Sequence, residues 1–243
     1  MNKEIDEIIA YLERVNRFSL PEYKELPNVD LYMEQVLAYV NGALADLSPD
    51  QEKILTSFMV NNYVKAGMID EPIKKKYSKD QIGYLLAISL LKQSLAMSDI
   101  SALLELDNGV SSNKEQLYRF FRDLEAGILT ETSRKTLQKA DGISRKYKLD
   151  KRSSPEEANA NARNGLGFIA LRLAVQAEAN KLLAEFILAR LRAEMHGEEA
   201  GQLSNPSKRE LRADKKGEKK KAKRINKAKK GPKAKKGKKH EDF

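Results

Sequence analysis

The sequence contains no cysteine, and only two of its 243 residues are histidines. The absence of cysteine excludes disulfides, thiolate metal sites and a cysteine nucleophile. His196 and His240 both fall late in the chain and far from any cluster of carboxylates, and no Ser–His–Asp pattern is present. We therefore expect a protein that is not an enzyme, with no catalytic residue, no metal site and no cofactor.

Long apolar runs are also missing. The longest, from Ile82 to Leu91, has about half of the roughly 20 residues that a membrane-spanning helix needs. The segment from Asn2 to Glu7 carries charges where a signal peptide would have an apolar run. We expect a cytoplasmic bacterial protein with no membrane partner.

The positive charge is concentrated at one end of the chain. The net charge is +10, but positions 206–243 hold 18 lysines and arginines against 5 acidic residues. The remaining 205 residues hold 27 basic and 30 acidic ones. The charge argument for a nucleic-acid partner therefore applies to the tail alone. The tail has almost no apolar residues and is expected to be disordered.

The periodicity of apolar residues predicts a mainly all-α fold. We expect helices over about 3–15, from about 30, 56–66, 79–93, 98–106, 112–125, 132–148 and 154–196. The predicted regions are an N-terminal helix and connector (1–27), a helix-turn-helix head (28–106), a helical connector (107–150), a long amphipathic helix (151–198) and the basic tail (199–243).

Capping residues mark several of these helix starts. Thr56 is placed to cap the short helix that ends near Gly67, where a left-handed backbone is expected. Capping boxes are predicted at Ser48–Gln51, Ser78–Gln81, Ser112–Glu115 and Ser154–Glu157. Extended structure is expected only where Met68–Ile69 could pair with Lys76–Tyr77 around Pro72.

The last predicted helix has a wide apolar stripe. It includes Leu166, Ile169, Leu173, Leu183, Ile187 and Leu191, with Phe168, Leu171, Val175, Leu182 and Phe186 alongside. Such a helix packs on its own domain or on a second copy of itself, so a homodimer through this helix is one expectation and a monomer the other. Asn164–Gly167 lies within the helical pattern and indicates a kink or a close helix contact rather than a phosphate-binding loop.

A polar helix followed by a basic turn is typical of a DNA-reading head. Val60–Tyr63, Gly67–Met68 and Lys75–Ser78 resemble the recognition helix and wing of MerR-type transcription regulators. Leu26–Val36 followed by Asn61–Lys65 resembles the bacterial domain of unknown function 1836, a distant MerR-like group. The resemblance covers roughly residues 20–110 and implies a winged helix-turn-helix with a minimal β wing.

The residue types agree with DNA contact. Asparagine can pair bidentately with adenine in the major groove, and lysine, serine and tyrosine can bind phosphate oxygens. The alternative is a solvated polar turn with Tyr63 in the core. The expected DNA-binding residues are Ser57, Asn61, Asn62, Tyr63, Lys65, Lys74, Lys75, Lys76 and Tyr77.

The tail is expected to bind phosphate without sequence preference. The residues assigned to this contact are Lys219, Lys220, Lys221, Lys223, Arg224, Lys229, Lys230, Lys235 and Lys236. The leading hypothesis is a DNA-binding transcription regulator. The alternative is a non-enzymatic helical interaction protein whose head no longer reads DNA and whose tail docks on RNA or the ribosome.

Overall fold

The computed structural model describes residues 3–48, 52–110, 113–148 and 154–195. Residues 1–192 form one compact unit and 193–243 a second, of which only the first three residues are described. The elements in chain order are α1 (Lys3–Arg17), a 3-10 turn (Tyr23–Glu25), β1 (Leu31–Tyr32), α2 (Met33–Ala43), a second 3-10 turn (Ala45–Leu47), α3 (Ser57–Lys65), β2 (Lys76–Tyr77), α4 (Lys79–Leu91), α5 (Met97–Val110), α6 (Lys114–Lys148) and α7 (Pro155–Met195).

The mainly all-α fold that the sequence predicts is confirmed, and three of its caps form. The Thr56 hydroxyl accepts a hydrogen bond from the Met59 amide at 3.4 Å, and Gly67 has a φ of 68°. Ser78 and Gln81 make both bonds of a capping box, at 3.4 and 2.7 Å. Ser154 and Glu157 do the same at the start of α7, at 3.2 and 3.0 Å. These caps satisfy amide groups that would otherwise lack partners at the helix starts.

The hydrophobic core of residues 1–192 is centred on α4. This helix is apolar around most of its circumference, which is typical of a helix enclosed by other elements. Side chains from the connector after α1 and from α2, α3, α5 and α6 pack with it. The largest fully buried side chains are Leu20, Leu26, Val36, Val40, Leu44, Leu55, Val60, Ile82, Leu85, Leu86, Ile88 and Ile100.

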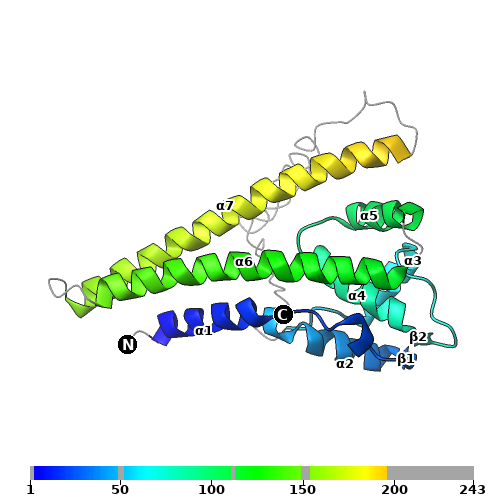
Figure 1. Cartoon of the computed structure of the whole chain (residues 1–243), viewed down its shortest axis with the longest axis horizontal. Helices are drawn as coiled ribbons and strands as arrows, with labels where there is room; N and C mark the ends of the chain where they lie inside the picture. Colours follow the sequence, from blue (N-terminus) through cyan, green and yellow to red (C-terminus); the bar gives the residue numbers. More distant parts are fainter. Residues whose placement is uncertain (1–2, 49–51, 111–112, 149–153, 196–243) are drawn as a thin grey trace, which may run out of the picture. The chain divides into compact units, whose positions relative to one another are not determined.

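α1 and α6 lie side by side along much of their length (Figure 1). The Ser133 hydroxyl of α6 donates to the Asn16 side-chain oxygen of α1 at 3.1 Å. Nearer the start of α6, the Tyr118 hydroxyl donates to the Pro21 carbonyl at 2.9 Å, and Arg122 Nε donates to the Leu20 carbonyl at 2.9 Å. α6 therefore holds both α1 and the connector that follows it.

Three predictions about individual elements are wrong. The helices expected at 112–125 and 132–148 form one continuous α6, because packing against α1 maintains the helix across Gly127 and Thr130. The helix expected directly after Ser48 does not form, because residues 52–56 are not helical. Positions 49–51 of the capping box predicted there lie outside the described residues. At the start of α6 the Asn113 side chain accepts from the Gln116 amide at 3.2 Å, whereas Ser112 lies outside the described residues.

The predicted strand pairing is the third of these errors. β2 pairs antiparallel with β1, with Leu31 opposite Tyr77 and Tyr32 opposite Lys76. Met68 and Ile69 instead turn into the core, where both are buried. None of the described helices is long and apolar enough to cross a membrane. The predicted basic tail, with all nine phosphate-contact residues, lies outside the described residues.

Candidate nucleic-acid interface

α3 has one buried face and one exposed polar face. Val60 and Tyr63 are buried, while Ser57, Asn61 and Lys65 are exposed and Asn62 is half-buried. Residues 57, 61 and 65 are spaced by four, so they follow one another on one side of the helix. Four of the five α3 residues that the sequence predicts to bind DNA therefore lie on one surface: Ser57, Asn61, Asn62 and Lys65.

Phe58 also belongs to the exposed face of α3, and its side chain is 72% exposed. A large aromatic at the first turn of a capped helix has no packing role there. The sequence alone gave Phe58 no role, because a phenylalanine beside Met59 and Val60 resembles a core residue. Its position one residue after Ser57, on the polar side of the helix, is the signal that could have found it.

Tyr63 and Tyr77 do not belong to this surface, in contrast to the prediction. Their side chains are 3% and 2% exposed, and burial raises the pKa of both hydroxyls. The spacing explains the error, because Tyr63 lies three residues after Val60 and therefore on the same, buried face of α3. The two tyrosines are core residues of the head.

The basic turn is a tight hairpin whose tip consists of two lysines. Ile73 and Lys76 form an isolated β-bridge, and the Lys76 amide donates to the Ile73 carbonyl at 3.0 Å. Lys74 and Lys75, between them, have φ values of 51° and 65°. Two-residue hairpins of this kind favour asparagine and glycine at the tip, because a side chain with a Cβ atom is strained at positive φ. The backbone thus bears a conformational cost at two lysines that are exposed to solvent.

Lys76 has a different environment from its two neighbours. Its ammonium group lies over the Tyr32 ring of β1, 4.9 Å from the ring centre. Tyr32 is itself half exposed. The pair stabilises the β1–β2 contact and leaves the lysine charge at the surface. Tyr32 was not among the predicted residues, since only the pairing of β1 with β2 brings it to the hairpin.

A network of polar contacts fixes the backbone just before α3. The Asn41 side chain of α2 donates to the Leu55 carbonyl at 2.9 Å and accepts from the Leu55 amide at 3.0 Å. The Lys92 ammonium at the end of α4 donates to the Ile54 carbonyl at 2.7 Å, and its burial lowers the pKa of this amine. α2 also packs against both strands. One helix therefore positions both α3 and the hairpin, which lie at the same end of residues 1–192 (Figure 1).

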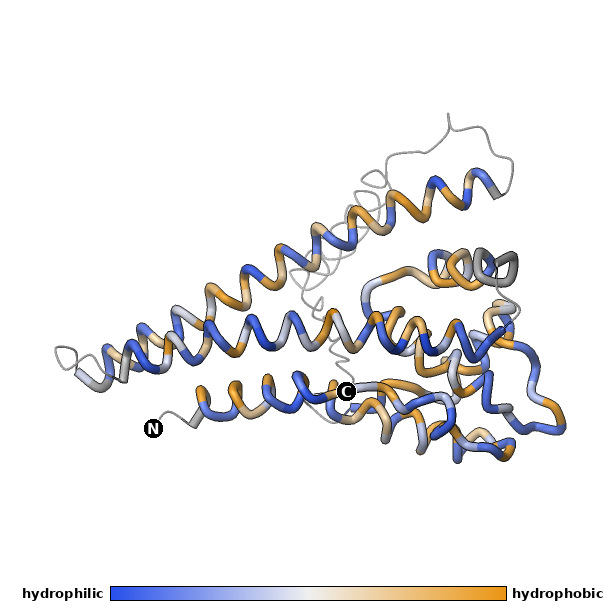
Figure 2. Tube along the Cα trace, in the orientation of Figure 1, coloured by the Kyte–Doolittle hydropathy of each residue, from blue (hydrophilic) through white to orange (hydrophobic). Residues whose placement is uncertain are grey.

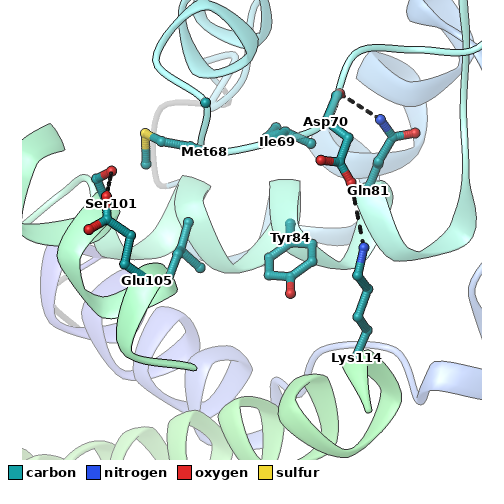
Figure 3. Close-up of a pocket in the computed structure, with 10 residues that line it drawn as sticks. Met68, Ile69, Asp70, Gln81, Tyr84, Ser101, Glu105 and Lys114 are labelled. Carbon is teal, nitrogen blue, oxygen red and sulfur yellow. Dashed lines mark hydrogen bonds and ion pairs between the residues drawn. The ribbon is translucent and has the colours of Figure 1, made fainter. Parts of the chain in front are cut away.

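A small polar opening of about 80 Å³ lies between the base of the hairpin and helices α4 to α6 (Figure 3). There the Gln81 amide donates to the Asp70 carbonyl at 2.8 Å, and the Lys114 ammonium lies 3.5 Å from the Asp70 carboxylate. The opening is much smaller than the roughly 300 Å³ at which ligand pockets begin. We therefore assign it to the support of the hairpin. Among the described residues, no group of histidine and acidic side chains could hold a metal ion.

The comparisons with known proteins agree with the predicted family. Residues 21–122 match the family described as Domain of unknown function (DUF1836). We assign this part of the chain, which runs from the connector through α5 into α6, to that family, and this confirms the prediction made from Leu26–Val36 and Asn61–Lys65. No curated protein and no solved structure matches the chain.

Proposed function

We propose that the head, residues 28–106, is a winged helix-turn-helix of the MerR-like kind that binds DNA in the cytoplasm and regulates transcription without catalysis. The observation that carries this proposal is the pair of left-handed lysines, Lys74 and Lys75, at the tip of the hairpin. Backbone strain that surrounding structure maintains is concentrated at functional sites. Lysine at positive φ costs conformational energy, and binding of the two charges to a negatively charged partner would offset that cost. The phosphate backbone of DNA is such a partner.

The exposed face of α3 supports the same function. A helix of nine residues fits the major groove, where Asn61 and Asn62 can pair with adenine. Phe58 can contact a thymine methyl group from the first turn of the helix. Lys65 and the hairpin lysines would bind phosphates and set the register of α3 on the duplex. Helix α2, the polar helix α3, the basic hairpin and helices α4 and α5 follow one another in the order on which the resemblance to MerR-type heads rests.

The predicted tail adds a second, nonspecific contact in this proposal. Its lysines would bind DNA phosphates wherever the head binds, and RNA is another possible partner for them. The head would then supply the sequence preference and the tail only the affinity. This division distinguishes a regulator from a helical interaction protein that docks on RNA or the ribosome through its tail.

The wing is tested with the double variant Lys74→Asn/Lys75→Gly. These residues suit the turn, so we expect the fold to gain about 1 kcal/mol in stability. We expect DNA affinity to fall, with the slope of log affinity against log salt reduced by about 2, because two phosphate contacts are lost. The matched control is Lys135→Gln/Lys139→Gln on α6, which removes the same charge elsewhere. An equal loss of affinity in the control would contradict a role for the hairpin.

Selection of binding sites from random DNA tests sequence reading. We expect the intact chain to enrich a defined site, Asn61→Ala/Asn62→Ala to lose that enrichment, and removal of residues 199–243 to weaken binding to all sequences alike. If removal of the tail alone abolishes all nucleic-acid binding, the interaction protein is the correct function. If the asparagine variant still enriches the same site, α3 is not the reading helix.

A further inference from the structure

The middle of α7 presents apolar side chains that no described part of residues 1–192 covers. Every residue from 171 to 180 is exposed. Figure 2 shows hydrophobic positions recurring along the length of the helix. Six large ones are between 57% and 73% exposed. Five of these six lie on one side of the helix: Phe168, Leu171, Val175, Leu182 and Phe186; the sixth, Leu183, lies outside this side. We call these five residues the α7 stripe.

The α7 stripe has the spacing of a helix-pairing surface. Its members are separated by three, four, seven and four residues, so they stay on one side of the helix over about five turns. The contacts of α7 with its own chain are concentrated near its two ends, where Phe168 of the stripe also lines an apolar hollow beside Ile143 of α6. Near its start, Gly165 approaches the Ile143 side chain of α6, and near its end Leu188 is buried and Arg192 forms an ion pair with Asp99 of α5.

From these observations we propose that the α7 stripe pairs with the same stripe of a second copy of this chain. The stripe exposes roughly 500 Å² of apolar surface, at the upper end of what monomers leave open. When the polar residues that border the stripe are included, the surface area approaches the roughly 800 Å² that each partner contributes to a stable interface. Positions 196–243 contain only four large apolar residues, widely spaced, so their sequence offers little apolar surface to match the stripe.

The charges beside the α7 stripe favour a parallel pair. Glu178 and Glu185 follow one edge of the stripe, and Arg172 and Arg190 follow the other. When two identical helices pair in parallel, the acidic edge of each faces the basic edge of its partner. In an antiparallel pair centred on the stripe, like edges would meet and bring the two copies of Glu178 together. The geometry therefore points to a parallel two-fold dimer.

A parallel pair also places both heads at the same end. The C-terminal part of α7 is tied to α5, within the head, by the 2.9 Å contact between Arg192 and Asp99. Two copies of α3 would then be presented together. In an antiparallel pair, by contrast, the heads would be separated by much of the roughly 60 Å length of α7. The dimer does not depend on DNA binding, so its test is independent of the proposed function.

Sedimentation equilibrium of the full chain tests the dimer. We expect a dimer for the unmodified protein and a dissociation constant raised roughly tenfold or more by Leu182→Glu within the α7 stripe. The control is Ile128→Glu on α6, a residue that is 58% exposed but outside the stripe, and it should leave the dimer intact. Circular dichroism of both variants verifies that the fold is retained. An unmodified protein that stays monomeric, or equal dissociation by the two variants, overturns the proposal.

Orientation is tested with a single cysteine, since the chain has none of its own. Asn164 is exposed and lies four residues before Phe168, at one end of the stripe. In the parallel dimer, Asn164→Cys should form a disulfide with its own copy under mild oxidation. In an antiparallel dimer the two thiols would be roughly 40 Å apart and no disulfide would form, which would overturn the parallel arrangement. Glu185→Arg should weaken the dimer, and adding Arg190→Glu should restore it.

Discussion

α4 and the middle of α7 are built from similar side chains but differ in environment. Ile82, Leu85 and Leu86 of α4 are fully buried inside the head, whereas Leu171 and Leu182 of α7 are more than half exposed. Hydrophobic content therefore does not indicate where the fold derives its stability. The head closes its core within one chain, while α7 keeps an apolar surface that is available for association.

The most direct way to test this difference is to shorten one leucine in each region. Leu86→Ala in α4 should reduce the free energy of unfolding by about 2–5 kcal/mol, because it removes buried methyl groups and leaves a cavity. Leu183→Ala in α7, where the side chain is 65% exposed, should change it by less than about 0.5 kcal/mol. Urea unfolding followed by circular dichroism measures both. Similar losses in the two variants would show that α7 packs as closely as the head.

The contact between Asp99 and Arg192 joins the two regions and gives a smaller effect. The Asp99 side chain is 6% exposed, and its carboxylate lies 2.9 Å from an Arg192 nitrogen. Arg192→Met should destabilise the fold by about 3 kcal/mol, because a buried carboxylate loses its counter-charge. The double variant Asp99→Leu/Arg192→Met should recover most of that loss. Amide exchange in α5 and at the end of α7 reports whether the junction opens, and an unchanged exchange pattern in Arg192→Met would show that the ion pair does not hold α7.

The sequence predicted the helices of the head better than the organisation of the C-terminal half. Caps at Thr56, Ser78 and Ser154 depend on residues within three positions of each other, so they can be recognised locally. The continuity of α6 depends on packing against α1, more than a hundred residues away, and no local pattern reports it. The exposure of α7 is likewise a tertiary property.

The candidate interface likewise combines features that the local sequence predicts with features that depend on tertiary contacts. Ser57, Asn61 and Lys65 could be assigned to one surface from their spacing alone. The burial of Tyr77 could not be predicted in this way, because it follows from the pairing of β2 with β1, which lies some 45 residues earlier in the chain. The strain at Lys74 and Lys75 was also hidden, since a positive φ at lysine contradicts the ordinary preference for that residue.

The smallest predicted effect concerns pH and the edge of the head. The Tyr23 hydroxyl donates to the Asp80 carboxylate at 2.5 Å and thereby ties the connector after α1 to α4. Burial, together with this hydrogen bond, raises the pKa of Tyr23 to about 12. The fold favours the protonated tyrosine, so its contribution to stability is complete below about pH 10 and is lost as pH rises through about 12.

Urea unfolding across this alkaline range should therefore separate Tyr23→Phe from the unmodified protein. The variant should be about 1 kcal/mol less stable at neutral pH, where the hydrogen bond is intact, and the difference should shrink as pH rises through about 12. Tyr32→Phe, which alters a half-exposed ring on β1, is the matched control and should show no such convergence. A Tyr23→Phe curve that runs parallel to that of the unmodified protein up to the highest pH would show that the contact with Asp80 does not close this edge. The head would then be less firmly closed there than its core around α4.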